Sequence, residues 1–203
     1  MAIRAGLVFG IVCAAPGIAA AQTLSPLEPG ILKILNQFRE DPAGYAAVLR
    51  QQRPYYHGDL LEIPGQPDLL TREGVRPLDE AIAALESMHA SLGRVALSAG
   101  LSRAAADEVL DSGRRGLIDH GDFEKRIARY GTWSGAIGEN IGYGAREARE
   151  VIVDLLIDDG VANRGHRKSL LDPRWRYVGI ACGFHARYGT MCVMDLASNF
   201  QDR

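Results

Sequence analysis

The chain has 203 residues, of which 47% are hydrophobic and 24% charged, a composition typical of one globular domain with or without an N-terminal appendage. Its formal net charge is only −2 at pH 7. This near-neutral balance gives no electrostatic argument for capture by nucleic acid or by a membrane surface, so we expect no nucleic-acid partner.

Residues 1–21 are predicted to be a secretory signal peptide. A single charge at Arg4 precedes an apolar run over residues 5–15, and small residues at 19–21 are typical of a cleavage site. The run is too short to span a bilayer. A lipoprotein anchored through Cys13 and a retained membrane anchor are the less favoured alternatives. We therefore expect an exported protein, periplasmic or secreted, with no transmembrane anchor once the signal is removed.

The first part of the mature chain is predicted to be helical and then irregular. Residues 22–30 hold two prolines and are expected to form a linker. A helix follows, with one apolar face made by Ile31, Ile34, Leu35 and Phe38. Asp41 before Pro42 predicts the N-cap of a second helix. Residues 53–78, with four prolines and three glycines, indicate an irregular surface loop that leaves Tyr55, Tyr56 and His57 exposed.

Further helices are expected over residues 79–91, from a cap at Ser98 to about Gly113, over 123–130 and over 145–158. The last is the most regular, with an apolar stripe on one face made by Val151, Ile152, Leu155 and Leu156. Asp158 and Asp159 end it, although acidic side chains at a helix C-terminus oppose the macrodipole. This placement indicates that other groups compensate the two carboxylates.

The pattern changes towards the C-terminus. Residues 177–182 and 190–196 are short apolar runs bounded by glycine, which predicts two antiparallel strands. Because the predicted helices come first in the chain and the predicted strands come last, the sequence favours an α+β fold with helices packed on a small antiparallel sheet. Glycines 138, 142 and 144 fit neither a dinucleotide-binding fingerprint nor a P-loop, so we interpret them as turn glycines.

Cysteine usage agrees with export. Removing the signal leaves Cys182 and Cys192, and an even number in an exported protein favours one disulfide. The two cysteines flank a turn at residues 185–189, so their sulfurs are expected to face each other across a hairpin. The alternative is a pair of buried free thiols.

Four polar residues are candidate ligands: His120, Glu139, Asp158 and His166. Each lies beside a glycine or near a helix end, where polar groups face clefts, and we expect them to line one shared pocket. Imidazole and carboxylate groups bind Zn²⁺ and similar ions. The spacing is not diagnostic, because 46 positions separate the two histidines and no His-Glu-x-x-His helix exists. On spacing alone, a structural role explains each residue better.

The order of the sequence blocks resembles the CAP superfamily, also called SCP domains. The resemblance extends from about residue 97 to residue 200 and is carried by His120, Gly138-Glu139-Asn140-Ile141, Asp158-Asp159-Gly160-Val161, Arg164-Gly165-His166-Arg167 and Val178-Gly179-Ile180-Ala181. It implies an α–β–α sandwich with a central antiparallel sheet. It also implies residues 97–203 as the CAP core, with residues 22–96 belonging to the same domain.

In many CAP proteins two histidines and two acids line a cleft and bind a divalent metal. By this resemblance His120, Glu139 and His166 match three of those positions. Asp158 is the counterpart of the fourth, where the family often has the longer glutamate.

Three functions are compatible with these observations. The favoured one is an exported binding module whose cleft holds Zn²⁺ or another divalent metal, a small apolar ligand, or an envelope component. The alternative is a metal-assisted hydrolase or peptidase, in which His120 and His166 hold the ion and Glu139 acts as general base on bound water. The third is a structural or partner-binding protein with a vestigial cleft.

Overall fold

The computed structural model describes residues 27–203, so the predicted signal peptide lies outside the described residues. Its helices are α1 (Leu27–Glu40), α2 (Pro42–Arg50), the 3-10 helix η1 (Arg53–Tyr55), α3 (Arg76–Glu86), α4 (Ala99–Arg115), α5 (Phe123–Tyr130), α6 (Ala148–Ile157) and α7 (Gly165–Leu170). Its strands are β1 (Tyr56–His57), β2 (Leu60–Leu61), β3 (Leu69–Leu70), β4 (Ala96–Leu97), β5 (Gly131–Tyr143), β6 (Tyr177–His185) and β7 (Gly189–Asp202).

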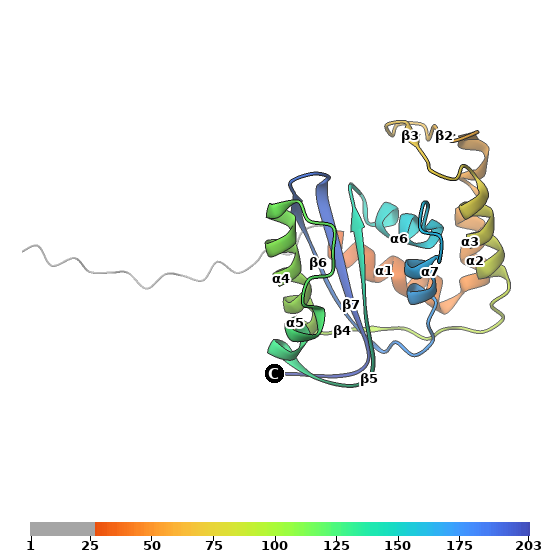
Figure 1. Cartoon of the computed structure of the whole chain (residues 1–203). Helices are drawn as coiled ribbons and strands as arrows, with labels where there is room; N and C mark the ends of the chain where they lie inside the picture. The colour runs from red at the N-terminus through yellow and green to blue at the C-terminus, as the bar shows by residue number, and fades with distance from the viewer. Residues whose placement is uncertain (1–26) are drawn as a thin grey trace, which may run out of the picture.

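These elements form three layers around one sheet (Figure 1). The sheet has the order β4-β6-β7-β5, with α4 and α5 on one face and α1, α6 and α7 on the other. Helices α2 and α3 lie beyond that second helical layer. The expected α+β fold and α–β–α sandwich are therefore confirmed. Strands β5, β7 and β6 are antiparallel, and the two-residue β4 pairs parallel to β6, which makes the sheet mixed.

Strand β5 was not expected from the sequence. It pairs with β7 from Gly131 to Tyr143 and contains Gly138 and Gly142, which are strand residues and not turn residues as interpreted above. A Cβ at Gly138 would lie 3.2 Å from the ring of Trp175, so glycine lets the second helical layer approach the strand closely. Only Gly144, with φ +81°, ends the strand in the left-handed conformation that favours glycine.

The larger hydrophobic core lies between the sheet and the layer of α1 and α6, and it continues outwards to α2 and α3. Its centre is built from side chains with no exposed surface, among them Ile31, Leu35, Leu85, Ile152 and Leu156. The core on the other face is smaller, and α4 contributes Leu101, Ala104, Ala105 and Val109 to it and approaches the sheet closely at Gly179. The predicted stripe on α6 is confirmed as core.

Several predicted helix boundaries are confirmed. Asp41 caps α2 by accepting a hydrogen bond from the Gly44 N–H at 2.9 Å, and Ser98 caps α4 through the Leu101 N–H at 3.1 Å. The predicted linker was wrong for residues 27–30, which form the first turn of α1. Helix α3 was predicted over residues 79–91, but it begins three residues earlier, at Arg76, and ends five residues earlier, at Glu86.

Residues 53–71, here called the flap, were expected to be irregular and exposed. They instead form η1 and a small antiparallel sheet with the order β1-β2-β3, beside the end of α3 (Figure 1). Tyr55 and Tyr56 are half-buried, the latter against the main core, which corrects the expectation of two exposed tyrosines. His57 is exposed, as expected. The flap therefore forms a wall facing α6.

Cys182 and Cys192 are bonded to each other, as predicted. They are register partners on β6 and β7, so the bridge crosses the hairpin directly. No helix between Leu27 and Arg203 is both long and apolar enough to cross a membrane.

Candidate functional site

The first histidine pairs with the first predicted acid. His120 lies in the connection between α4 and α5, and its Nδ1 is 2.7 Å from Oε1 of Glu139 on β5. The His120 side chain is 54% exposed, whereas that of Glu139 is 2% exposed. The hydrogen bond to Glu139 is the main cause that raises the pKa of His120 above its ordinary value. The pair therefore presents an imidazole to solvent over a buried carboxylate.

A buried charge cluster supports Glu139 from below. Arg126 of α5 lies 2.6 Å from Glu108, donates to the His120 carbonyl at 2.8 Å and pairs with Glu139 through Nη2. Asp195 on β7 is fully buried beside Glu139. Burial, and secondarily the charge of Glu139, raises the pKa of Asp195 well above its ordinary value. Glu139 therefore pairs with an arginine and lies beside a second buried acid.

The second histidine pairs with the second predicted acid. Nδ1 of His166 lies 2.7 Å from Oδ1 of Asp158, and Oδ2 of Asp158 accepts from the His166 N–H at 2.9 Å. Asp158 ends α6 in the left-handed conformation, with φ +60°, which turns its carboxylate towards the start of α7. The backbone N–H groups of α7 thus compensate a charge that α6 disfavours, as the sequence indicated.

The two pairs lie on opposite faces of the sheet. Glu139 shares a face with its register partner Asp195, whose own partner on β6 is Gly179, and Gly179 abuts α4. The neighbouring Gly138 faces the other way, towards Trp175 and α7. The structure therefore joins His120 to Glu139 and His166 to Asp158. Within residues 27–203, no three side chains of His, Cys, Asp or Glu converge as a metal site.

Both histidines use the same ring nitrogen. Nδ1 contacts the carboxylate in each pair, and no partner within the described part of the chain engages either Nε2. In metal sites a carboxylate commonly holds one ring nitrogen while the other binds the ion. The geometry therefore gives Glu139 and Asp158 an orienting role and leaves the Nε2 atoms of His120 and His166 as the candidate ligands.

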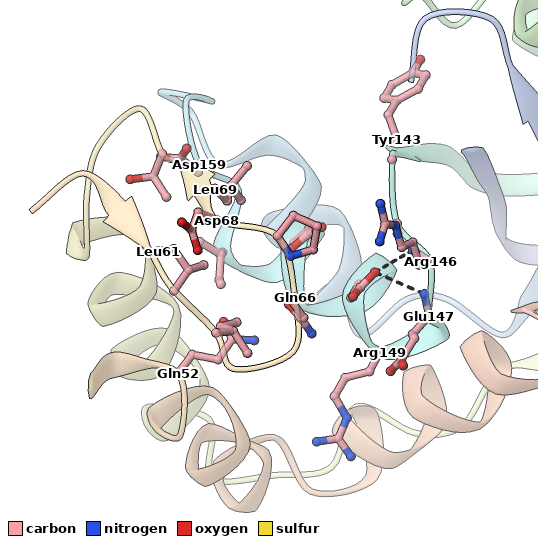
Figure 2. Close-up of a pocket in the computed structure, with 18 of the residues that line it drawn as sticks. Gln52, Leu61, Gln66, Asp68, Leu69, Tyr143, Arg146, Glu147, Arg149 and Asp159 are labelled. Carbon is pink, nitrogen blue, oxygen red and sulfur yellow. Dashed lines mark hydrogen bonds between the residues drawn. The ribbon is translucent and has the colours of Figure 1, made fainter. Parts of the chain in front are cut away.

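A separate cavity of about 570 Å³ lies between the flap, α6 and the segment that follows β5 (Figure 2). None of the four residues predicted from the sequence lines it. Its apolar wall consists of Leu61, Ile63, Pro67, Leu69, Ala145 and Ile157, with Tyr56, Tyr143 and Tyr188 adding aromatic surface. No pattern in residues 53–71 predicted this site, because it depends on how the flap packs against α6.

Asp154 is one of three charged residues of α6 that line this cavity, together with Arg149 and Glu150. Its side chain is accessible to solvent, although protein surrounds it on most sides. No hydrogen bond or ion pair reaches its carboxyl from residues 27–203. Burial, with a smaller contribution from Glu150, raises the pKa of Asp154 to about 7. One signal pointed to it: it is the single acid between Val151 and Ile157, an otherwise apolar run.

The match to a protein-family model identifies the fold. Residues 32–196 match the model of the cysteine-rich secretory protein family, CAP. The chain belongs to this family. The matched region of the CAP domain begins within α1, so it includes helices that precede the residues on which the sequence resemblance was based.

No protein with a curated description matches the sequence. Two solved structures are similar to this CAP domain. An outer surface protein from Borrelia burgdorferi is 16% identical, with a TM-score of 0.45, over 53% of this chain and 79% of that one. An extracellular protein containing an SCP domain from Bacillus anthracis is 18% identical, with a TM-score of 0.41, over 52% of this chain and 34% of that one.

Proposed function

We propose that this CAP-domain protein is an exported binding module whose small, largely apolar ligand occupies the cavity between the flap and α6. The cavity carries the proposal, since about 570 Å³ falls within the roughly 300–1,000 Å³ typical of small-molecule sites. Its mostly apolar wall with a few polar groups also fits such a site.

The flap supports the proposal because it exposes apolar side chains beside the cavity. Leu69 on β3 lines the cavity and is 54% exposed. A ligand that covers this side chain removes apolar surface from water, which favours binding by about 25 cal/mol per Å². The signal-like N-terminus and the Cys182–Cys192 bridge support export.

A binding assay on the mature chain tests this function. We expect decanol to bind saturably in isothermal titration calorimetry. The variant Leu69→Asp should weaken that binding at least tenfold, because it places a charge against the alkyl chain of decanol. Leu110→Asp is the matched control, because Leu110 is 47% exposed on α4, away from the cavity. Absence of saturable binding, or equal loss in both variants, would contradict a ligand site at the cavity.

A divalent metal such as Zn²⁺ is a second candidate ligand, at the His120 and His166 pairs. The observation that favours it is the shared orientation, in which each carboxylate holds Nδ1 and leaves Nε2 free. Each pair offers a single imidazole Nε2, and the two pairs lie on opposite faces of the sheet, whereas a catalytic zinc site has three protein ligands. We therefore rank the metal-assisted hydrolase or peptidase below the binding module and derive no hydrolytic step.

Elemental analysis of the purified mature protein tests the metal. We expect near-stoichiometric metal that His166→Ala removes and His57→Ala retains, because His57 lies on the flap, away from both pairs. A hydrolase additionally requires that hydrolysis disappears together with the metal. Metal content that is negligible, or equal in both variants, would reject the metal and the hydrolase together.

A further inference from the structure

The cavity between the flap and α6 has an acidic lining. Five carboxylate side chains and two guanidinium groups line it; the acids are Asp68, Glu147, Glu150, Asp154 and Asp159. The two basic residues are Arg146 and Arg149, and Figure 2 shows the Arg149 guanidinium directed away from the flap. An apolar hollow with this excess of acids selects for positive charge in whatever occupies it.

Part of this negative charge is already engaged by the protein. Glu150 accepts from the backbone N–H groups of Arg146 at 2.6 Å and Glu147 at 3.2 Å. Asp159 accepts from two backbone N–H groups of the segment after the flap, at 2.7 and 3.0 Å. Asp154 has no such donor within the described residues. Asp68 on the flap has none within residues 27–203 either, so Asp154 is the acid on α6 that is free to pair with a ligand in the cavity.

The position of Asp154 explains why a bound cation would stabilise its ionised carboxylate. On α6 its solvent-accessible side chain lines the cavity together with Ile157, one helical turn further on. Burial raises its pKa to about 7, which means that the protein alone does not stabilise the ionised form. A cation placed against the carboxyl would supply the missing partner.

The aromatic side of the cavity lies in the same negative field. Burial, followed by the charges of Asp159 and Asp154, raises the pKa of Tyr56 to about 12, so the Tyr56 hydroxyl lies near both acids. Tyr143 and Tyr188 line the cavity too, and Figure 2 shows Tyr143 at the end of β5, across from the flap. Aromatic rings attract cations as well as apolar groups, so a lining with three tyrosines suits a ligand with both properties.

We propose that the cavity binds an amphipathic organic cation, a protonated amine on an apolar body, with its ammonium group against Asp154. The apolar body lies along Leu61, Ile63 and Leu69 of the flap. This inference rests on the proposed function, because it names the class of ligand that the same cavity takes.

Three probes of equal chain length test the charge. Decylamine, decanol and decanoate share one apolar body and differ at the head group, and each is titrated calorimetrically into the mature protein at pH 8. We expect decylamine to bind at least tenfold more tightly than decanol, and decanoate to bind most weakly. Asp154→Asn is expected to reduce decylamine affinity to that of decanol and to leave decanol unchanged. Asp111→Asn, outside the cavity on α4, is the control.

The same probes separate the two proposals. If none of them binds saturably, the cavity is not a ligand site and both proposals fail. If decanol binds but decylamine binds no more tightly, or Asp154→Asn leaves the decylamine affinity unchanged, the cation is rejected and the apolar ligand stands.

A measurement on the wild-type protein covers the case in which the variant does not fold. A proton competes with the cation for Asp154, so the affinity ratio of decylamine to decanol should fall severalfold from pH 8 to pH 6. The other charged or titratable groups that line the cavity are Asp68, Glu147, Glu150, Asp159, Arg146, Arg149 and the three tyrosines. A ratio that stays constant over this range would overturn the assignment to Asp154.

Discussion

Glu139 on β5 and Asp195 on β7 are register partners, and their carboxyl groups lie together in the interior beside Arg126. Glu108 approaches the same guanidinium from α4. Three buried acids around one arginine cannot all be ionised without a large cost, because like charges and burial both favour the neutral carboxyl. Asp195 is fully buried, and burial followed by the charge of Glu139 raises its pKa well above the ordinary value, so the fold favours its neutral form.

Replacing Asp195 with asparagine is therefore expected to stabilise the protein at neutral and alkaline pH. A carboxyl whose pKa is raised in the folded state contributes stability that is complete below its unfolded pKa, near 4. That contribution is lost as the pH rises towards the folded pKa. An asparagine side chain mimics the protonated acid without this loss, so we expect Asp195→Asn to gain roughly 1 kcal/mol or more at pH 8.

Urea unfolding at pH 4 and at pH 8 measures this effect. The difference between Asp195→Asn and the wild type should be small at the lower pH and grow at the higher one. Asp111→Asn serves as the control, because Asp111 is an exposed acid paired with Arg115. A stability difference that is independent of pH would contradict a protonated Asp195.

The Glu139 carboxylate is expected to control the titration of His120. Its hydrogen bond and charge raise the pKa of His120, so the pair stabilises the fold below about pH 6.5, and this stabilisation is lost as the pH rises through the folded pKa. In Glu139→Gln the pKa of His120 should fall, as measured by NMR titration of the imidazole. Glu62→Gln on the flap is the control. An unchanged His120 titration in Glu139→Gln would show that the pair does not form in solution.

The elements with strong local signals were predictable from the sequence. Helix α5 was predicted from Phe123 to Tyr130 because Gly131 ends its pattern, and the structure has the same limits. The hairpin of β6 and β7 was visible because its strands are apolar. Strand β5 was not, because glycines and polar residues hide its alternation. The carboxylates at 158 and 159 indicated a compensating partner, but only the structure shows that α7 and the chain after the flap supply it.

The candidate sites were only partly predictable for the same reason. Sequence blocks identified both histidines and both acids, but not their division into two pairs on opposite faces of the sheet. That division depends on which face of β5 each residue occupies, and β5 itself was missed. The cavity depends on how the flap is placed against α6, which no local pattern encodes. Asp154 and Asp195 share a usable signal, since each is a lone acid within an apolar run.

The close approach of α4 to the sheet predicts a severe effect at Gly179. A Cβ there would overlap the backbone carbon of Leu101, and helix backbone cannot move aside as a flexible side chain can. We expect Gly179→Ala to cost about 3 kcal/mol or more in the free energy of unfolding. Gly142→Ala is the matched control on β5, because its Cβ would meet Val151 at an ordinary 3.5 Å.

Thermal and urea unfolding of the two alanine variants compare these positions directly. Gly142→Ala should stay close to the wild type, or gain slightly because alanine restricts the unfolded chain. Equal stability of the two variants would mean that α4 does not pack against β6 at Gly179.

The disulfide is expected to stabilise the hairpin mainly by restricting the unfolded chain. With a sequence separation of 10 residues, the chain-entropy relation gives about 3 kcal/mol for the closed loop. Reduction of the wild type should lower its free energy of unfolding by this amount, measured by urea unfolding with and without dithiothreitol. The Cys182→Ala/Cys192→Ala variant should already show the loss and should not respond to the reductant. A wild type that is equally insensitive would indicate that the thiols are free, since an intact bridge cannot be cut without releasing the loop it closes.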